Sequence, residues 1–459
     1  MAPRFPTSAP TDYDVIVAGG GPSGAVAAIA AARNGARTFL FEKHPFLGGS
    51  LTAMGVGPMM SFHNPAGRQV VKGIPQEIVD RLTERGASPG HIDDTTTYCS
   101  TVTPFDAEAL KAVLEDMALE AGVTLLYHAQ LAAVACDREL EGVTLCTKAG
   151  LLEFRSKIFI DATGDGDLAF QAGTPFQKGR ESDQKTQPMT MNLKVANVDM
   201  ARVRAYIEEH PDDFYRDPND PAWLDKLRRS PRLSAGGFRK AWEEAKARGE
   251  ITIPREYLLF FETATPGVVI INTSRIQDLD PNDPFDLTRA EILGRRQCDE
   301  IFRFVRKHCP GFENAIRCDG PAQIGVRESR HVRGLYRLTA DDLLNQTDFP
   351  DAVARGGYPI DIHSPDAAET HTRHLPPDGS YAIPLRCLLV EKPDNLIIAG
   401  RCLSATAEAF AAVRVTPISM AIGQAAGTAA ALAVRHQSLP RDVDVPELQQ
   451  TLRAQGAIL

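Results

Sequence analysis

Three glycines near the start of the chain lie at the spacing that a bound dinucleotide requires. Gly19, Gly21 and Gly24 fit the pattern G-x-G-x-x-G, directly after the apolar segment DVIVA. The first glycine permits a tight turn, the second lets the backbone approach a pyrophosphate, and the third lets a helix close onto the preceding strand. A helix that begins near Pro22 would direct its free N–H groups and its positive dipole end at the phosphates. The chemistry that these residues indicate is binding of a dinucleotide.

An acidic residue follows the glycines at the distance expected for the same fold. Glu42 ends the segment TFLFE, roughly 20 residues beyond the glycines. A carboxylate at this place can accept hydrogen bonds from both hydroxyls of the adenosine ribose, and it would repel a 2′-phosphate. Strand, glycine turn, helix, second strand and acid occur in order, which favours a nucleotide-binding unit over an unrelated glycine-rich loop.

The sequence YPIDIHSPD offers groups that could move a proton. On an extended strand Asp361 and His363 face the same side, so the carboxylate could fix the orientation and the tautomer of the imidazole. Tyr358 and His63 are competing acid or base groups. A purely structural role for His363 is the alternative that the residues themselves leave open.

Arginines provide candidate partners for a substrate carboxylate, which a guanidinium can hold through two parallel hydrogen bonds. Arg327 and Arg330 lie in GVRESRHVRG, and Arg414 lies in AAVRVTP. If the first segment were helical, Arg327 and Arg330 would be neighbours, with Glu328 and Glu77 among their possible partners. Ordinary salt bridges explain these arginines equally well.

Composition and cysteine usage exclude several classes of function. The chain has 459 residues and a net charge of −9, and no stretch collects Lys and Arg into a long basic stripe. We therefore expect no nucleic-acid partner, and we expect small molecules instead. None of the eight cysteines forms a C-x-x-C pair, which argues against a redox disulfide and a zinc ribbon. His371 and His374 lie near His363, but without a carboxylate or cysteine at ligand spacing we predict no metal site.

Neither a signal peptide nor a membrane span is predicted. Residues 1–10 lack an apolar core and are expected to form a short disordered lead-in, so the predicted location is cytoplasmic. The segment 418–434 is rich in Ala and Gly, but Gln424 and the small side chains suit a helix that packs closely inside a protein.

The remaining patterns predict an α/β protein with two domains. Helical periodicity predicts helices near 75–84 and before Gly122, and alternating residues predict a β-meander that ends at FIDATG. A long helix with Thr288 as N-cap and one opened by Thr416 and Pro417 are also expected. The predicted domains are a discontinuous Rossmann-like domain, a parallel sheet with a β-meander, of residues 1–60, 100–182 and 322–459, and an inserted α+β substrate or cap domain of residues 61–99 and 183–321.

Several blocks together resemble a known family. DVIVAGGGPSGAVAA, FIDATGDGDLAFQAGTPF and DNLIIAGRCLSATAEAFAAVRVTPISM, with IGVRESRHVRG and GYPIDIHSPD, look like FAD-dependent oxidoreductases with the glutathione-reductase-like FAD-binding fold. They are more distantly similar to fumarate-reductase-type flavoproteins. The resemblance implies FAD as cofactor, held by Gly19, Gly21, Pro22, Ser23, Gly24, Glu42, Lys43, Gly48, Gly49, Ser50, Leu51, Thr52, Ala162, Thr163, Gly164, Gly400, Arg401, Thr416, Pro417 and Ile418.

The resemblance also implies how the flavin would be used. The helix that starts at Thr416 should point at the N1/C2=O edge of the flavin ring and stabilise negative charge there. Succinate-dehydrogenase-like enzymes attach the flavin through a histidine shortly after the second pair of glycines. Here the corresponding segment SLTAMGVGPM contains no histidine before His63, so binding of FAD should be non-covalent. We expect hydride transfer between flavin N5 and a small oxygenated or carboxylated organic substrate, with catalysis by His363, Tyr358 and Asp361. Substrate binding would fall to Arg327, Arg330, His63 and Arg414.

Two other functions stay open at this stage. The sequence GDGD after the meander faintly resembles a motif of aromatic hydroxylases, so a flavin-dependent monooxygenase is one alternative. A flavin-bound subunit of a larger complex is the other. No second glycine fingerprint for NAD(P)H is present, so the electron partner could be oxygen, a quinone, NAD(P)H or another protein, and a homo-oligomer is possible.

Overall fold

The computed structural model describes residues 11–216 and 220–459, so the expected lead-in at residues 1–10 lies outside the described residues. The larger of its two regions is built on a sheet with the strand order β5-β2-β1-β8-β7-β6, and β20 also pairs with β8. Strands β5, β2, β1, β8 and β20 run parallel, while β6, β7 and β8 form the antiparallel meander. The strands are β1 (Asp12–Ala18), β2 (Thr38–Phe41), β5 (Thr124–Leu126), β6 (Gln130–Cys136), β7 (Leu140–Thr147), β8 (Gly150–Asp161) and β20 (Leu396–Ile398). The predicted parallel sheet with a β-meander is confirmed.

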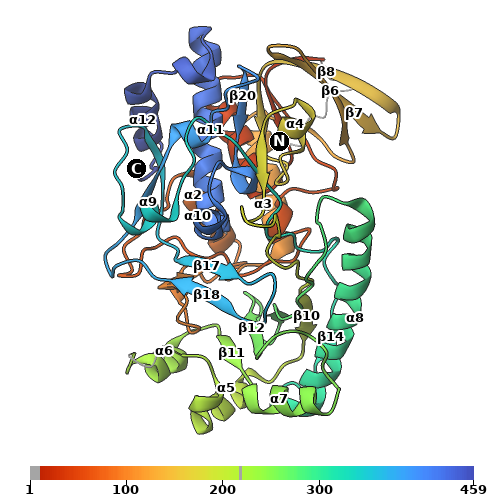
Figure 1. Ribbon diagram of the computed structural model, residues 1–459. Coiled ribbons are helices and arrows are strands. Elements are labelled where there is room, and N and C mark those ends of the chain that lie inside the picture. Colours follow the sequence, from red (N-terminus) through yellow and green to blue (C-terminus); the bar gives the residue numbers. More distant parts are fainter. Residues whose placement is uncertain (1–10, 217–219) are drawn as a thin grey trace.

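Two helices from opposite ends of the chain pack side by side against this sheet (Figure 1). They are α1 (Pro22–Arg33) and α11 (Thr416–His436). A Cβ on Gly423 would lie 2.2 Å from the carbonyl oxygen of Ser23, and one on Gly427 would lie 2.0 Å from that of Ala27. The two glycines therefore allow a backbone approach that no other residue permits.

Helix α11 begins at Thr416, with Pro417 in its first turn, as the sequence predicts. It is long and apolar enough to cross a membrane, but 89% of its apolar window is buried inside the protein. This burial fits a core helix. The other helices of the larger region are α2 (Ile74–Glu84), α3 (Ala107–Glu120), α4 (Asp167–Gln171), α9 (Ala340–Leu344), α10 (Ala407–Val413) and α12 (Val445–Ala454).

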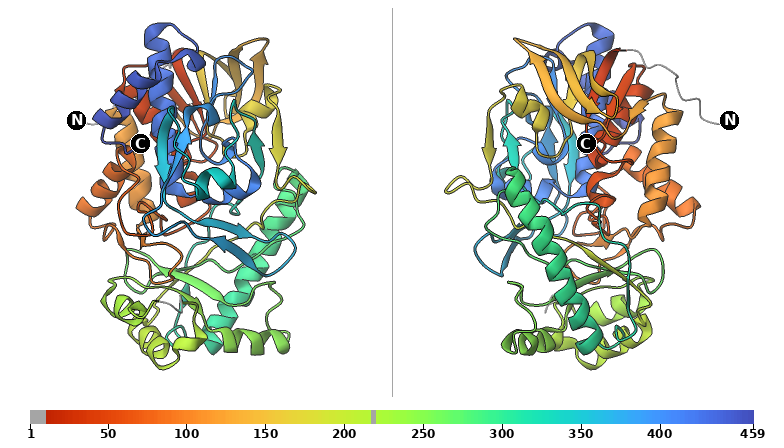
Figure 2. Two further views of the ribbon diagram at one scale, coloured as in Figure 1. Left: turned by 60° about the vertical axis from the view of Figure 1, so that its left-hand side comes forward. Right: turned by 90° about the vertical axis from the view of Figure 1, so that its right-hand side faces the viewer.

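The second region is the inserted cap, drawn in green at the lower end of both views in Figure 2. It has its own apolar core, in which Phe238, Trp242, Phe260 and Phe312 are fully buried. An antiparallel sheet in the order β11-β12-β13-β10-β14 supports it. The elements of the cap are β10 (Leu193–Ala196), β11 (Ser234–Gly237), β12 (Leu258–Glu262), β13 (Val269–Ile271), β14 (Ile316–Arg317), α5 (Met200–Glu209), α6 (Trp223–Arg229), α7 (Arg239–Ala247) and α8 (Pro284–His308).

Within residues 11–216 and 220–459, four short two-stranded sheets connect and cover these regions. The pair β17 and β18 lies between the larger region and the cap and carries the motif IDIH (Figure 1). The pairs are β3 (Ile92–Asp93) with β4 (Thr101–Val102), β9 (Phe176–Lys178) with β15 (Arg330–Val332), β16 (Ala352–Gly356) with β19 (Tyr381–Pro384), and β17 (Ile360–His363) with β18 (Thr370–Arg373).

The structure corrects two local expectations. Helix α8 begins at Pro284, and its N-cap is Asp283, whose carboxylate accepts hydrogen bonds from two backbone N–H groups. Thr288 lies one turn inside the helix, where its hydroxyl donates to the carbonyl of Pro284. Residues 61–99, assigned to the cap from the sequence, do not form part of it as a whole, because α2 packs on α1, α3 and α11 and its apolar face joins the core of the larger region.

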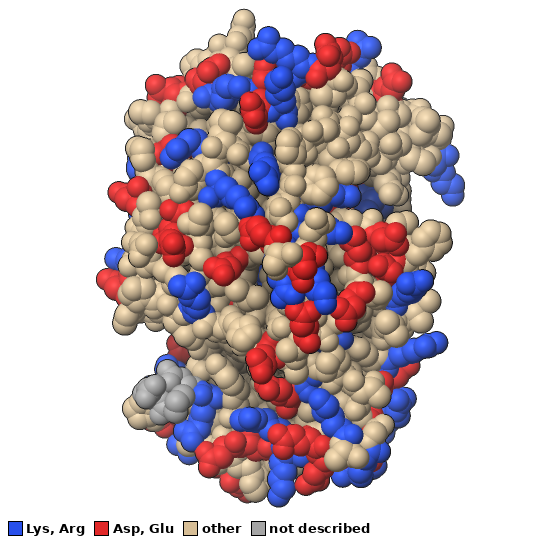
Figure 3. Space-filling model, viewed as in Figure 1, with Lys and Arg blue, Asp and Glu red and all other residues tan. Residues whose placement is uncertain are grey.

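Acidic and basic side chains alternate over the face shown in Figure 3, and no large area of this face carries a single sign of charge. Many of the surface charges form ion pairs, for example Arg81 with Glu120 and Arg180 with Asp366. Exposed pairs of this kind contribute little to stability, because water and salt screen them.

Candidate functional site

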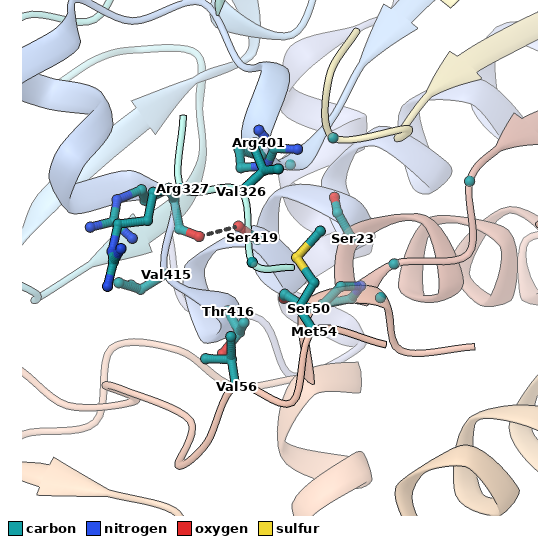
Figure 4. Close-up of a pocket in the computed structure, with 18 of the residues that line it drawn as sticks. Ser23, Ser50, Met54, Val56, Val326, Arg327, Arg401, Val415, Thr416 and Ser419 are labelled. Carbon is teal, nitrogen blue, oxygen red and sulfur yellow. Dashed lines mark hydrogen bonds between the residues drawn. The ribbon is translucent and has the colours of Figure 1, made fainter. Parts of the chain in front are cut away.

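One large cavity, the main cavity, lies where the glycine turn, the N-terminus of α11 and the cap meet. It contains about 1480 Å³ of space that is partly open to solvent. Side chains from both ends of the chain surround it, among them Ser23 and Ser50 on one side and Thr416 and Ser419 on the other (Figure 4). Of the predicted cofactor residues, those that line it are Gly19, Gly21, Pro22, Ser23, Glu42, Lys43, Gly49, Ser50, Ala162, Thr163, Gly164, Gly400, Arg401 and Thr416.

The three glycines of the motif have three different environments. Gly19 has a φ of +92°, and a Cβ there would lie 2.7 Å from the carbonyl oxygen of Ala162. A Cβ on Gly24 would lie 1.9 Å from the carbonyl oxygen of Gly19, so this glycine brings α1 against the turn. A Cβ on Gly21 would meet no protein atom within 4 Å and would project into free space beside the main cavity. This is the position at which a bound pyrophosphate can approach the backbone.

The start of α1 presents donors to the same space. Its N-cap is Gly21, so no side chain caps the first N–H groups of the helix, and Pro22 lies in the first turn. The hydroxyl of Ser23 is buried, lines the main cavity and has no hydrogen-bond partner among the described residues. Free N–H groups, the positive end of the helix dipole and an unpaired hydroxyl together suit a phosphate.

Glu42 holds the turn as well as facing the cavity. One carboxylate oxygen accepts from the N–H of Gly20 at 2.6 Å, and the other accepts from the N–H of His44 at 2.9 Å. A carboxylate has about four lone-pair positions, so it can still accept hydrogen bonds from ribose hydroxyls. His44 is itself fixed by Gln323, which contacts its Nε2 at 2.9 Å.

Six of the predicted cofactor residues support the cavity without lining it. The N–H of Gly48 donates to the carbonyl of Gly20 at 2.8 Å, and the hydroxyl of Thr52 donates to the carbonyl of Leu47, which fixes the loop that carries Gly49. Leu51 and Ile418 are buried in the apolar core. The full set that does not line the cavity is Gly24, Gly48, Leu51, Thr52, Pro417 and Ile418.

An ion pair closes the cavity at the end of β8. Arg401 contacts Asp165 at 2.6 Å and the hydroxyl of Ser329 at 2.8 Å. Burial alone would raise the pKa of the Asp165 carboxyl, but Arg401 and the hydrogen bonds lower it below its ordinary value. Asp161, at the end of the strand, accepts hydrogen bonds from Thr163 and from the N–H of Ala169, which orders the following turn.

The predicted proton-transfer groups come together on β17 and the turn before it. The Nε2 of His363 lies 3.3 Å from Oδ2 of Asp361, as the alternation of the strand predicts. The hydroxyl of Tyr358 donates to the same oxygen at 3.4 Å, and Oδ1 of Asp361 is buried without a partner among the described residues. Thr370, on β18, contacts Nδ1 of His363 at 3.3 Å. The residues Tyr358, Asp361 and His363 all line the main cavity.

These groups have perturbed acidities. Burial, followed by the charge of Arg327, lowers the pKa of His363 to about 3, so the imidazole is neutral at neutral pH. Burial raises the pKa of the Tyr358 hydroxyl well above its usual value. For Asp361, burial acts to raise the pKa, but His363, Arg414 and Arg327 lower it far below its ordinary value. At neutral pH Asp361 is therefore ionised, while Tyr358 and His363 carry no charge.

Two of the predicted arginines line the main cavity. Arg327 donates to the carbonyl of Pro188 at 2.6 Å and also bonds to Thr190. Arg414 contacts the side chain of Gln187 at 3.4 Å, but its buried Nε has no partner among the described residues. Burial, together with the charges of other arginines, lowers the pKa of Arg327 well below its usual value.

Two predicted substrate residues lie elsewhere. Arg330 begins β15, pairs with Asp167 at 3.0 Å and stacks over the ring of Phe170. The segment with Arg327 is irregular rather than helical, and Arg330 begins a strand, so the two arginines are not neighbours on one helix face. His63 bonds to Thr101 at 2.8 Å and does not line the main cavity.

The proposed acidic partners are engaged with other residues. Oε2 of Glu328 accepts a hydrogen bond from the N–H of Gln187 at 2.8 Å, and its Oε1 lies 3.1 Å from Nε2 of His331. Glu77 pairs with Arg33 and Arg81 on the surface. These contacts leave Arg327 and Arg330 without the carboxylates that the sequence suggested.

Several cavity residues carry no recognisable pattern in the sequence. Asp165 lies in the sequence GDGD directly after β8, and this position was the only feature of the sequence that pointed to it. Ser419 lies in the first turns of α11, and the others come from the cap and its connections, where folding alone brings them to the cavity. The residues that the sequence did not single out include Asp165, Thr190, Asn192, Asn272, Gln323 and Ser419. In the described ranges 11–216 and 220–459, no group of His, Cys, Asp and Glu could hold a metal ion.

Comparison with known proteins places the chain in a family. Residues 14–452 match the model of the family described as FAD dependent oxidoreductase. A search among curated proteins gave no match.

Several solved structures are similar to this chain. A geranylgeranyl bacteriochlorophyll reductase-like protein from Thermoplasma acidophilum is 15% identical, with a TM-score of 0.46 over 96% of this chain and 82% of that one. The flavin-dependent brominase Bmp2 is 13% identical, with a TM-score of 0.49 over 97% and 83%. The p-nitrophenol 4-monooxygenase PnpA from Pseudomonas putida DLL-E4 is 11% identical, with a TM-score of 0.46 over 97% and 82%.

The family match extends over nearly the whole chain, and the glycine turn, the unpaired Ser23 hydroxyl and the free space beside Gly21 fit the cofactor that it implies. The protein belongs to the FAD-dependent oxidoreductases, and its cofactor is FAD.

Proposed function

We propose that this oxidoreductase binds FAD non-covalently in the main cavity and transfers a hydride between flavin N5 and a small organic acid. The adenosine would lie toward Glu42 and the pyrophosphate against Gly21 and Ser23. The flavin ring would lie toward the N-terminus of α11, near Thr416. When bound, FAD supplies a two-electron acceptor or donor. The chain supplies the binding of the acid and the transfer of its proton.

The observation that carries this proposal is the unbalanced positive charge of the cavity wall. Arg327 and Arg414 both line the cavity, and the charges of Arg255 and Arg275 also act on Arg327. Asp361 is the carboxylate that acts on Arg327 in the opposite sense. Because buried charges are costly without partners, a substrate carboxylate would be stabilised at the unpaired Nε of Arg414.

The proton would be held by His363. With Nε2–H donating to Asp361, Nδ1 is the basic nitrogen, and the hydroxyl of Thr370 can donate to it. In oxidation of a hydroxy acid, the C–H bond breaks and its electron pair leaves with the hydride. The Thr370 hydroxyl first turns away from Nδ1 and frees its lone pair, which takes the O–H proton. The Thr370 hydroxyl then turns to accept from Nδ1–H. A bound carboxylate offsets the arginine charges, so it should raise the pKa of His363 and make the imidazole a better base.

The test is anaerobic bleaching of the purified, yellow protein with a panel of small hydroxy acids and the matching alcohols that lack a carboxylate. We expect acids to bleach the flavin and the alcohols to fail. Arg414→Met should abolish this preference, whereas Arg333→Met, an exposed arginine outside the cavity, should keep it. His363→Ala should retain FAD but bleach at least tenfold more slowly. Equal bleaching by alcohols and acids, or normal bleaching by His363→Ala, would contradict the proposal.

The same experiment separates the alternatives. Oxygen consumption coupled to a hydroxylated product and dependent on an external reductant would indicate a monooxygenase. Flavin that no small molecule reduces, but that a partner protein does reduce, would indicate a subunit of a larger complex.

A further inference from the structure

A second cavity lies between the cap and strand β18, beside the proton-transfer groups of the main cavity. It contains about 720 Å³ of space, partly open to solvent. We define it by the residues Tyr98, Tyr215, Arg239, Arg255, Tyr257 and Thr370, which all line it. None of these residues belongs to the cofactor site, so the second cavity requires its own explanation.

Aromatic surface dominates one side of this cavity. The ring of Tyr215 stacks on Tyr98 at 5.4 Å and on Tyr257 at 6.1 Å, with interplanar angles of 13° and 19°. The hydroxyls of Tyr98 and Tyr257 contact each other at 2.7 Å. The three rings are therefore held nearly parallel, and a flat aromatic ligand could extend such a stack.

An unpaired positive charge lies against the aromatic surface. Arg255 is only 3% exposed, and its buried Nε has no hydrogen-bond partner among the described residues. Its guanidinium carbon lies 5.5 Å from the centre of the Tyr257 ring, and within the described ranges no carboxylate forms an ion pair with it. A buried guanidinium without an anion is costly, which indicates that an anionic ligand completes this site.

The charges around the cavity favour an anion. Arg239 and Arg255 line it together with one exposed carboxylate, Glu256. The charge of Arg255 also acts on Arg275, which donates to the backbone carbonyls of Ser364 and Glu369 and has no carboxylate partner there. The net charge of the side chains that line the cavity is positive.

One hydrogen-bonded residue connects the two cavities. Thr370 lines the second cavity and contacts Nδ1 of His363, which lines the main cavity, at 3.3 Å. Thr370 thus lies between the imidazole of His363 and the second cavity.

We propose that the second cavity binds an aromatic ring that carries a carboxylate, with the ring on the tyrosine surface and the carboxylate on Arg255. This aryl carboxylate is either the outer end of a long substrate or a separate molecule. Its binding goes beyond the proposed hydride transfer and does not depend on it.

The first test uses the unmodified holoenzyme. Benzoate, cyclohexanecarboxylate and benzamide are titrated in a calorimeter, and the visible spectrum of FAD is followed in parallel to report binding in the main cavity. We expect benzoate to bind at a site that leaves the flavin spectrum unchanged. Cyclohexanecarboxylate keeps the charge but lacks the aromatic ring, and benzamide keeps the ring but lacks the charge, so both should bind at least fivefold more weakly. Absence of benzoate binding at millimolar concentration, or equal affinity for all three, would overturn the proposal.

Variants locate the site. Arg255→Met should weaken benzoate binding at least tenfold, whereas Lys240→Met, which removes an exposed charge on the same helix as Arg239, should leave it unchanged. Arg255→Lys keeps the charge without the planar fork, and it should bind with intermediate affinity. Benzoate bound normally by a folded Arg255→Met protein would refute the assignment. Arg414→Met should retain this binding, so a failure of the proposed function is distinguishable from a failure of this site.

Competition identifies the source of the ligand. If benzoate excludes small acids from the main cavity, the second cavity is the outer part of one substrate path. If both bind together, it is a separate site. Both results support an aryl carboxylate site, and they differ only in which molecule carries the group.

Discussion

Replacing Gly21 and Gly24 by alanine, one at a time, should separate the stability of the protein from its affinity for FAD. The same chemical change is made three residues apart in one turn. At Gly24 the new Cβ would lie 1.9 Å from the carbonyl oxygen of Gly19, whereas real Cβ atoms essentially never come within 3.0 Å of such an atom. The helix must therefore move away from the turn by about 1 Å, and overpacking of this kind costs about 1–3 kcal/mol or more.

At Gly21 the free protein should tolerate alanine. Its φ of −63° and ψ of −178° are extended values that alanine adopts, and no protein atom lies within 4 Å of the new Cβ. The loss of flexibility in the unfolded chain should stabilise the apoprotein by about 0.4–1 kcal/mol. The methyl group would occupy the space of the pyrophosphate, so we expect FAD affinity to fall by roughly 1–3 kcal/mol, about 5- to 150-fold.

The assay is urea unfolding of the apoprotein, followed by titration of the apoprotein with FAD under fluorescence detection. Gly24→Ala should lower both the free energy of unfolding and the affinity, and Gly21→Ala should lower the affinity alone. The reasoning is refuted if Gly21→Ala binds FAD as tightly as the unmodified protein, or if Gly24→Ala apoprotein unfolds at the unmodified urea concentration.

Three further changes test other parts of the structure. Gly427→Ala places a Cβ 2.0 Å from the carbonyl oxygen of Ala27, so it should reduce the free energy of unfolding by about 2 kcal/mol or more, measured with urea, and normal stability would contradict the close packing of α1 and α11. The pKa of His363 is about 3 in the folded protein and 6.5 in the unfolded chain. Between these pH values the unfolded chain binds one more proton than the folded protein. The free energy of unfolding should therefore fall as the pH decreases from 6.5 to 3, by up to about 1.4 kcal/mol per pH unit. For His363→Gln, urea unfolding at several pH values should show a weaker dependence of the free energy of unfolding on pH. An unchanged dependence would contradict the lowered pKa of His363. Arg401→Met leaves Asp165 without its cation and should lower the free energy of unfolding by about 3 kcal/mol, measured with urea. Adding Asp165→Asn to this variant removes the unpaired charge and should restore part of the lost stability. Unchanged stability of Arg401→Met would contradict a role of the ion pair in stability.

Short sequence patterns predicted the features of the fold that depend on local backbone geometry. The glycine turn, the meander and the start of α11 depend on backbone geometry and short-range periodicity, and the sequence contains both. Asp361 and His363 were predicted to face the same side because a strand alternates every second residue, and they lie 3.3 Å apart. At α8, Asp283 followed by Pro284 was the stronger start signal, and the apolar residues after Thr288 concealed it.

The features that the sequence did not predict depend on tertiary packing. Arg330 was a candidate by its type, but Asp167 and Phe170 bind it away from the cavity. Helix α2 lies in residues 61–99, which the sequence assigned to the cap, yet it packs on α11, which begins more than three hundred residues further along the chain. Asn192, Asn272 and Gln323 reach the cavity only because the cap folds over it, and no spacing within the sequence records that approach.

The contact between Gly423, Gly427 and the backbone of α1 sets the order of events during synthesis. The ribosome completes the glycine turn and α1 more than three hundred residues before it synthesises α11, the helix that covers them. Until then the apolar face of α1 has no partner from α11, and the phosphate-binding turn has no opposite wall. Loading of FAD should therefore follow synthesis of α11, and nascent chains that stop before residue 416 should remain colourless.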